Sequence, residues 1–360
     1  MGTLRSLGDT PLINNMGKTS GVSPLKMSGV SPTRQITMLS YIIRRLLLII
    51  PMLLGISLIT LLIMHLSPGD PASIKYGLNP EVAGSARAKF NELYGLDKPI
   101  LAQFIIWLKR IIVFDFGNSF IDDRPVIAKV MERLPATLLL EILSILVIYL
   151  VSIPIGISSA VKADSPYDRM MTVAVFVGYA TPDFWFALLL IMFFGVGLGW
   201  FPISGMRPWY IDYYSIFDSL KDLIWRLVLP IIATSLVSLA GISRYMRSSM
   251  LEVLRQDYIR TARAKGLKES SVIYKHALKN ALLPIVTIAS MILPALIGGS
   301  FIIETIFAWP GMGRLGYEAI MNYDLPTVMG VGVISAFLTL LGLVLADVMY
   351  AIVDPRIRYD

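Results

Sequence analysis

Apolar residues gather in six long runs that contain no charged side chain, and this pattern predicts membrane-spanning helices. A helix needs roughly 20 apolar residues to cross about 30 Å of hydrocarbon, and lipid offers no water to backbone groups. The runs are Leu46–Gly69, Ile142–Val161, Phe184–Met206, Leu227–Ser243, Asn280–Ile303 and Leu325–Ala346. We therefore predict an all-α polytopic membrane protein with six transmembrane helices, the third of which begins near Met170.

Lysine and arginine are shared unequally between the two sets of short loops, and this asymmetry predicts the orientation in the membrane. The loops on the same side as both termini hold nineteen of these residues, and the opposite short loops hold four. We therefore expect both termini to be cytoplasmic. Residues 70–133 are then an extracytoplasmic insertion, in which we expect short helices, one of them around Pro99–Val113.

The remaining boundaries follow from composition. Residues 1–37 are rich in Ser, Gly, Thr and Pro and repeat the sequence SGVSP, so we predict a disordered tail there. Met38 is an alternative translation start. Residues 38–69 hold the first transmembrane helix, and residues 134–360 hold a five-helix permease core with a cytoplasmic loop at 244–280.

Composition excludes several classes of protein. Charged residues make up 16% of the chain, whereas soluble domains average about 25%. The chain has no cysteine and only two histidines, which lie far apart, so we expect no disulfide, thiolate centre or metal site. The net charge of +7 is explained by the basic cytoplasmic loops, and binding to nucleic acid is not needed to explain it.

Two segments resemble nucleotide-binding motifs but lack the structural context of such sites. Gly17-Lys18-Thr19 lies in the predicted tail, and the pattern Gly311-x-Gly313-x-x-Gly316 follows a membrane helix where the dinucleotide motif needs a strand. We expect these last glycines to permit tight turns in an external re-entrant loop. No catalytic motif occurs, so we predict that the chain is not an enzyme and binds no cofactor itself.

The cytoplasmic loop 244–280 is predicted to contain two short helices. The first would run from about Gln256 to Lys265 and end at Gly266 in the left-handed conformation. Ser270 or Ser271 would cap the second. Such a loop could simply fix the topology through its nine basic residues, or it could be a docking knob.

In the docking alternative, three side chains of the first short helix, Tyr258, Ile259 and Ala262, would present the contact face.

The same loop carries a family resemblance. The run Asp257–Leu267, followed by His276–Pro284, closely resembles the EAA loop of ABC importer permeases, in particular their dipeptide/oligopeptide/nickel branch. Further segments agree in the family's order: Tyr41–Ser73, Tyr94–Ile100, Glu132–Leu139, Phe301–Met321 and Ala346–Tyr359. The resemblance therefore covers nearly the whole chain from Met38 onward.

The resemblance implies a type I ABC importer permease fold in a bacterial or archaeal cytoplasmic (inner) membrane. It implies three kinds of protein partner besides the lipid bilayer: a second, homologous permease in a heterodimer, two ATP-binding subunits that hold ATP and Mg, and an extracytoplasmic substrate-binding protein. Di- and oligopeptides are the expected substrates, with nickel, glutathione or sugars as alternatives. An ion-driven secondary carrier is the alternative from a different class.

The resemblance also assigns the loop to coupling with the ATPase subunits. Arg260-Thr261-Ala262 stand where the general pattern has Glu-Ala-Ala, and Gly266 is the matching glycine. The residues implied to couple are Asp257, Tyr258, Ile259, Arg260, Thr261, Ala262, Arg263, Ala264, Lys265, Gly266 and Leu267.

Acidic residues inside the predicted spans are candidates for the translocation path, because a buried carboxylate is costly unless it is paired or faces water. Asp183 would either cap a helix restarted after Pro182 or face the path, together with Phe184 and Trp185. Glu141, expected one or two turns into the second helix, would pair within the subunit or near an interface, and it is also a tentative path residue.

The external loops are the expected docking surface for the binding protein. Candidate residues there are Trp309, Pro310, Gly311, Met312, Gly313 and Arg314. Asp347, close to the end of the sixth helix, is expected to be structural. His65, at the outer end of the first helix, is expected to face the interface.

Overall fold

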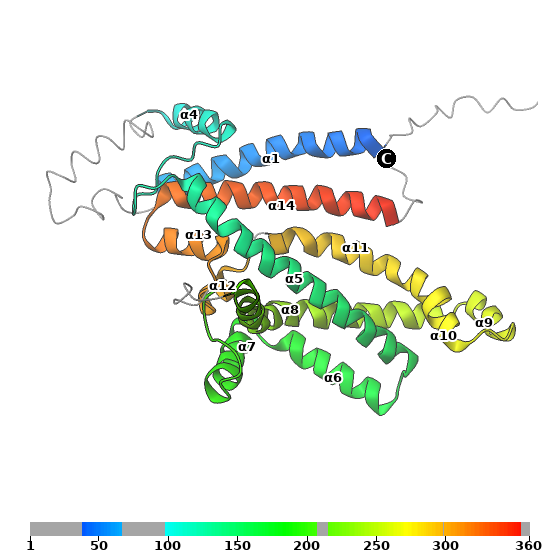
Figure 1. Cartoon of the computed structure of the whole chain (residues 1–360). Helices are drawn as coiled ribbons and strands as arrows, with labels where there is room; N and C mark the ends of the chain where they lie inside the picture. Colours follow the sequence, from blue (N-terminus) through cyan, green and yellow to red (C-terminus); the bar gives the residue numbers. More distant parts are fainter. Residues whose placement is uncertain (1–37, 67–97, 207–214, 298, 354–360) are drawn as a thin grey trace, which may run out of the picture.

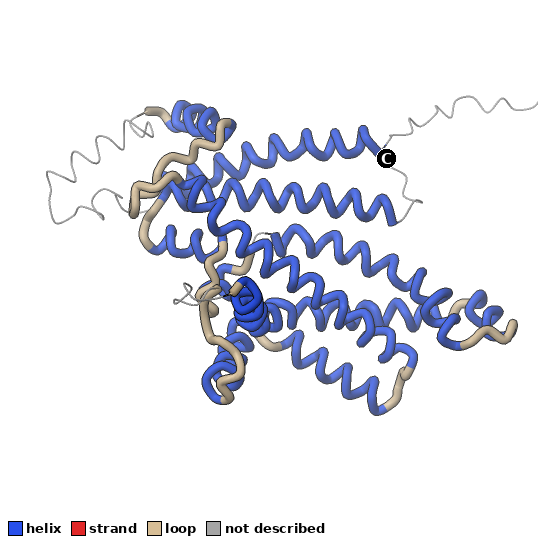
Figure 2. Tube along the Cα trace, in the orientation of Figure 1, coloured by secondary structure: helices blue, strands red, loops and turns tan. Residues whose placement is uncertain are grey.

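The computed structural model describes residues 38–66, 98–206, 215–297 and 299–353 (Figure 1). The predicted tail 1–37, the first part of the insertion 70–133, and the side chains of His65 and Asp347 lie outside the described residues. The described residues form helices joined by loops (Figure 2), with one isolated bridge between Asn118 and Pro125.

Long helices appear where the apolar runs predicted them. They are α1 (Met38–Leu66), α5 (Val126–Val161), α8 (Ile216–Leu254), α11 (Leu278–Ile297) and α14 (Leu325–Val353). Four of the five contain a stretch long and apolar enough to cross a membrane: α1, α5, α8 and α14. The fifth, α11, has 20 residues, and its side chains are described only as far as Ile288.

The third predicted span is broken, and the prediction of a single helix there is wrong. Helix α6 (Pro166–Ala180) is followed by α7 (Asp183–Leu190) and the π-helix η1 (Ile191–Gly197), and the chain bends by 104° between them. Thr181 is extended, with φ −82° and ψ 123°, because the ring of Pro182 disfavours a helical residue before it. The described residues thus give four candidate spans, or five if the bent pair is counted as one.

Short helices lie at the two ends of the molecule. At one end lie α4 (Ile100–Ile112), α12 (Phe301–Ile306) and α13 (Met312–Met321). At the other lie α9 (Asp257–Ala264) and α10 (Glu269–Ser271), together with the start of α1 and the end of α14 (Figure 1). The short helix predicted around Pro99–Val113 is confirmed as α4.

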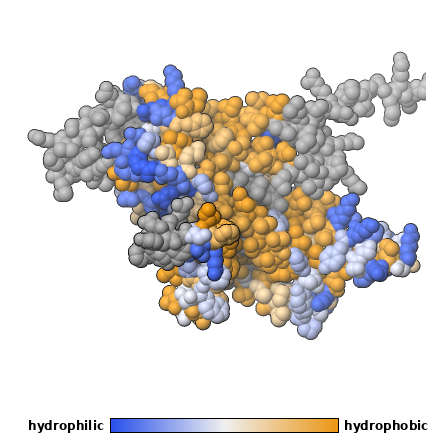
Figure 3. All heavy atoms as spheres, in the orientation of Figure 1, coloured by the Kyte–Doolittle hydropathy of each residue, from blue (hydrophilic) through white to orange (hydrophobic). Residues whose placement is uncertain are grey.

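Hydropathy divides the surface in the same way. An apolar band runs between two more hydrophilic ends in the view of Figure 3. Large apolar side chains on α1, α5 and α6 are exposed, among them Leu47, Ile142, Leu150 and Phe176, each at 59–64%. Exposed apolar area of this extent marks a surface that contacts lipid or another protein.

Helices α5 and α8 pack closely along their length. A Cβ added to Gly156 of α5 would lie 2.5 Å from Met246 Cβ and 2.9 Å from Ser243 O of α8. Farther along, Ser235 Oγ donates a hydrogen bond to Ser144 O (3.3 Å). Small residues that allow close approach and polar ones that bond across helices are typical of packing in membranes.

Candidate functional site

The loop 244–280, predicted to be cytoplasmic, contains a small knob, which we define as residues 255–271. Helix α8 ends at Leu254, two residues pass, and α9 begins at Asp257. Gly266 follows the end of α9 with φ +73°, and a Cβ there would meet nothing within 4 Å. Its backbone conformation therefore explains the glycine, and the prediction that Gly266 ends the first short helix is confirmed.

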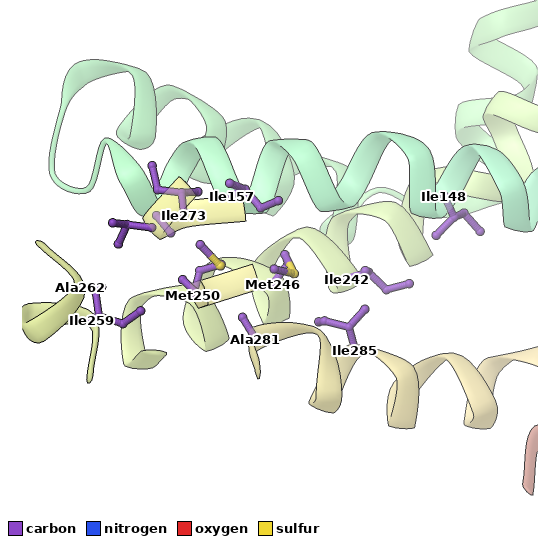
Figure 4. Packing of buried hydrophobic residues seen from close by; sticks show 13 residues of the cluster. Ile148, Ile157, Ile242, Met246, Met250, Ile259, Ala262, Ile273, Ala281 and Ile285 are labelled. Atoms are coloured by element: carbon purple, nitrogen blue, oxygen red, sulfur yellow. The ribbon is translucent and has the colours of Figure 1, made fainter. Parts of the chain in front are cut away.

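The inner face of the knob is packed against the chain's own core. Ile259 and Ala262 are 0% and 7% exposed and belong to one buried cluster with Met246 and Met250 of α8 and Ala281 of α11 (Figure 4). The prediction that Ile259 and Ala262 form the contact face is therefore wrong. Spaced three residues apart on one helix face, they attach α9 to the body of the molecule.

The outer face of the knob is polar and exposed. Tyr258, Arg260, Thr261, Ala264, Lys265 and Leu267 are all exposed, as is Asp257. The guanidinium of Arg263 bonds the carboxylate of Glu269 at 2.7 Å and so ties α9 to α10. These hydrogen bonds hold the pKa of Glu269 below its usual value.

The second half of the knob runs directly into a long helix. Helix α10 begins at Glu269 with Lys268 as its N-cap, and no side chain caps it, so the prediction that Ser270 or Ser271 is the cap is wrong. The chain then passes through the π-helix η3 (Val272–Ala277) into α11. Asn280 Nδ2 of α11 donates a hydrogen bond to Tyr258 Oη of α9 (2.8 Å).

A buried ion pair near this end joins α6 to α8. Arg247 Nε and Nη2 donate to the two carboxylate oxygens of Asp168, at 2.7 and 2.6 Å, and Asp168 is 2% exposed. A two-pronged pair of this kind fixes orientation as well as distance. The sequence analysis did not find it, because the two residues are 79 positions apart and no local pattern links them.

At the helix break, Asp183 is the first residue of α7 and Pro182 occupies the N-cap. The backbone N–H of Phe184 donates to Asp183 Oδ1 (2.7 Å), and a carboxylate in the first turn is favourable for the helix dipole. The side chains of Phe184 and Trp185 are about half exposed, at 47% and 51%. A role of these residues in the translocation path stays a prediction.

Glu141 is buried in the middle of α5. The helix begins at Val126, so Glu141 lies about four turns from its start, and the prediction of one or two turns is wrong. The side chain is 2% exposed, and its Oε2 atom has no hydrogen-bond partner in the part of the chain that the structure describes. The expected pairing of Glu141 is therefore not observed within those residues.

At the opposite end, a fully buried carboxylate holds two short helices to α5. Glu304 of α12 accepts hydrogen bonds from Thr137 Oγ1 (2.8 Å) and from the backbone N–H of Arg314 (2.7 Å). Thr137 Oγ1 in turn accepts from the backbone N–H of Met312 (2.7 Å). We call Glu304, Thr137 and the start of α13 the carboxylate latch. Burial raises the pKa of Glu304 overall, although these hydrogen bonds oppose the shift.

The glycines of the GxGxxG pattern make room for this latch. A Cβ on Gly311 would collide with the Glu304 carboxylate, and one on Gly313 would lie 2.8 Å from Phe301 N. Gly311 has φ −100°, so the expected need for a tight turn is wrong there. The requirement is space and not an unusual backbone conformation.

The predicted docking residues are largely internal. Trp309 is 0% exposed and its Nε1 donates to Ala136 O (2.9 Å), and Met312 is 2% exposed. Gly311 is buried too, whereas Pro310, Gly313 and Arg314 are half-buried. The side chains of Trp309 and Met312 therefore hold the loop to α5, and docking by the loop as a whole stays a prediction.

Among the described residues, no group of three or more His, Cys, Asp or Glu side chains is arranged to hold a metal ion.

The chain matches known protein families over most of its length. Residues 152–359 match the family described as "Binding-protein-dependent transport system inner membrane component", and residues 38–141 match the family of its N-terminal region. Both matches lie within the segment that resembles the importer permeases in sequence.

Several proteins are similar to nearly the whole chain. The oligopeptide transport system permease protein AppB of Bacillus subtilis (strain 168) is 45% identical over 323 residues, which are 89% of this chain and 100% of AppB. The dipeptide transport system permease protein DppB of Alkalihalophilus pseudofirmus is 38% identical and covers 89% and 100%, respectively. The di/tripeptide transport system permease protein DppB of Pseudomonas aeruginosa (strain UCBPP-PA14) is 36% identical and covers 90% and 100%.

The fold is similar to a solved one. A chain of the MetNI methionine ABC transporter, in inward-facing conformations, matches with a TM-score of 0.51 and 19% identity, over 63% of this chain and 97% of that one. At this identity the likeness concerns the fold, which is that of an ABC transporter permease.

Proposed function

We propose, on the premise that this chain belongs to the family of binding-protein-dependent transport system inner membrane components, that it forms half of the membrane path of an ATP-driven peptide importer. The chain is a membrane component of a transporter and not an enzyme. The relatives named above are called oligopeptide, dipeptide and di/tripeptide permeases, and this supports di- and oligopeptides as the substrates.

The proposed topology has six spans with both termini in the cytoplasm. In it, α6 with α7 and η1 counts as the third span and α11 as the fifth. The excess of basic residues in the loops beside the termini supports this orientation. So does the placement of the start of α1, the end of α14 and the knob at one end of the molecule (Figure 1).

The observation that carries the proposal is the construction of the knob. Its inner face is fixed to α8 and α11 by the cluster around Ile259, and its outer face is free and polar. A surface element built in this way can receive a push from a partner and pass it to two long helices. We therefore assign the exposed side chains within Asp257–Leu267 to docking on an ATPase subunit that binds ATP and Mg, while Ile259 and Ala262 anchor the knob.

The other proposed partners are a second, homologous permease and an external binding protein. The exposed side chains beside the helix break, Phe184 and Trp185, would face the cavity between the two permeases together with Asp183. Peptides would be released into that cavity by the binding protein, which would dock on the external loops. Glu141 is buried within this chain and would act, if at all, from behind the cavity wall.

Reconstitution of the complete importer tests the proposal. Proteoliposomes that contain both permeases, the ATPases and internal ATP should take up a labelled dipeptide or oligopeptide only when the binding protein is present outside. Uptake driven by a proton or sodium gradient without ATP would instead support a secondary carrier. ATP-dependent uptake of nickel, glutathione or a sugar, with none of peptides, would keep the transporter class and change the substrate.

A further inference from the structure

A hydrophilic pocket lies at the external end of the chain, where the two external segments meet. It has a volume of about 440 Å³. One wall is residues 121–133, which enter α5, and the other is residues 315–327, which form most of α13 and the start of α14. These segments belong to the two loops that the sequence analysis expects to dock the binding protein.

Every carboxylate that lines the pocket already has a cationic partner. Asp122 and Asp324 both face Lys129 Nζ, at 3.1 and 3.8 Å, and Glu132 pairs with Arg124. The fourth, Glu318, accepts from Arg314 Nε at 2.7 Å.

One of the carboxylates that line the pocket, that of Asp324, accepts several hydrogen bonds. Asp324 is fully buried and also accepts hydrogen bonds from Ser119 Oγ, Thr327 Oγ1 and the backbone N–H of Phe120. Both oxygens of the Asp324 carboxylate therefore have hydrogen-bond donors.

Arg133 is different. Its side chain lines the same pocket and is half-buried. It makes no hydrogen bond or ion pair with any residue in the described ranges. The positive charge of Arg133 acts on the nearby carboxylate of Glu304. The oxygens of that carboxylate, however, accept their hydrogen bonds from Thr137 Oγ1 and the backbone N–H of Arg314. Among the described residues, Arg133 is thus the one charged side chain lining the pocket that makes no direct hydrogen bond or ion pair.

We propose that this pocket is a socket for an aspartate or glutamate side chain of the external binding protein, which Arg133 would bind through its guanidinium. A guanidinium presents paired donors whose geometry fits a carboxylate, and a half-buried one gains more from such a partner than a fully exposed one does. The inference rests on the proposed function, because it presumes that a binding protein docks at this end.

The test uses the complete reconstituted importer and measures the concentration of peptide-loaded binding protein that gives half-maximal ATP hydrolysis. Arg133→Gln should raise this concentration about tenfold and leave the maximal rate unchanged. Arg133→Lys should restore part of the loss, because a point charge remains but the paired geometry is gone. The loss should shrink at high salt, where the wild-type contact is itself screened.

The double variant Arg124→Gln/Glu132→Gln is the matched control. It removes a charge pair from the rim of the same pocket and leaves the net charge as it was, so the half-maximal concentration should stay within about twofold of wild type. The stricter test is a charge swap. The weakened docking of Arg133→Glu should be repaired by changing one particular acidic residue of the binding protein to lysine or arginine.

Three results would overturn the socket while leaving the proposed function intact. The first is a half-maximal concentration unchanged in Arg133→Gln. The second is a fall in maximal rate alone, which would mean that Arg133 only compensates Glu304. The third is stimulation of ATP hydrolysis by free dipeptide in the absence of binding protein that is lost in Arg133→Gln, which would make the ligand the substrate itself. A wild-type importer that does not respond to the binding protein at all would instead refute the proposed function.

Discussion

Apolar packing holds short helices at both ends of this molecule, and at one end a buried carboxylate adds hydrogen bonds that tie two of them to a long helix. At the proposed cytoplasmic end, the knob is attached by apolar side chains, with Ile259, Met250 and Val272 in one buried cluster. At the proposed external end, the carboxylate of Glu304 bonds short helices to α5, and the carboxylate of Asp324 bonds the loop before α5 to the start of α14. Apolar packing depends weakly on direction, whereas a buried carboxylate tolerates only one arrangement of its donors.

This difference suggests that the two ends respond differently to movement of a partner. A knob that docks on a moving ATPase, as proposed above, can shift slightly within an apolar contact and lose little. The carboxylate latch cannot shift gradually, because each buried donor or acceptor that loses its partner destabilises the fold by about 1–3 kcal/mol. We therefore expect the external end to keep its shape during transport and the cytoplasmic end to yield.

The largest effect is expected from Glu304→Ala. The substitution leaves Thr137 and the start of α13 without their acceptor inside the protein and creates a cavity. Each buried donor left without an acceptor costs about 1–3 kcal/mol, and Thr137 Oγ1 and the backbone N–H of Arg314 both lose theirs. The melting temperature in detergent should fall clearly. Glu318→Ala removes an acid from the same region whose side chain is 41% exposed, and it should change stability by about 1 kcal/mol or less. Equal melting temperatures for the two variants would contradict the latch.

Ile259→Ala should destabilise the knob by about 2–4 kcal/mol, because it leaves a cavity in a site that is 0% exposed. The expected signature is faster amide exchange in α9 and α10, with ATP hydrolysis that no longer drives full uptake. Thr261→Ala, on the exposed face of the same helix, is the control. It should leave exchange unchanged, and if it loosened the knob as much as Ile259→Ala, the assignment of inner and outer faces would be wrong.

Gly311→Ala should cost about 1–3 kcal/mol, because the added methyl group overlaps the Glu304 carboxylate. Gly241→Ala offers a matched comparison. Gly241 lies inside α8 with nothing within 4 Å of an added Cβ, so alanine there should be neutral or slightly stabilising. Thermal unfolding of the two variants separates them, and a stabilised Gly311→Ala would show that the space is not needed.

The smallest effect concerns the Arg263–Glu269 pair, which is exposed and contributes about 0–1 kcal/mol. Because the folded-state pKa of Glu269 is lowered, the pair stabilises the knob above the usual glutamate pKa and is lost as pH falls through the lowered value. The chain has no cysteine, so Ser270→Cys allows a single spin label. Its mobility should rise as pH falls from 7 to 3, and Arg263→Gln should already show high mobility at pH 7.

Much of this arrangement could be predicted from local sequence. The charge-free runs predict the long helices because the membrane forces apolar stretches to be helical. Gly266 and the helix Ile100–Ile112 follow from signals that act within a few residues. The knob's position is also local, since it depends on the basic loop between two spans.

The remaining features depend on residues that are distant in sequence. Glu304 meets Thr137 across 167 positions and Arg247 meets Asp168 across 79, and no periodicity encodes such a meeting. The apolar residues Ile259 and Ala262 were expected to contact a partner because a short helix alone does not show which side is covered. The 104° bend after α6 follows from Pro182, but its angle depends on what α7 packs against.

Helix α5 contacts the structures at both ends of the molecule, so a movement at one end can be passed directly to the other. Its Thr137 and Ala136 hold the external latch, and its Ile157 and Ala160 belong to the cluster beneath the knob. One helix of 36 residues, about 54 Å long at 1.5 Å per residue, therefore touches both ends. A tilt imposed by nucleotide at the inner surface would reach the outer surface along a single rod, without passing through a loop.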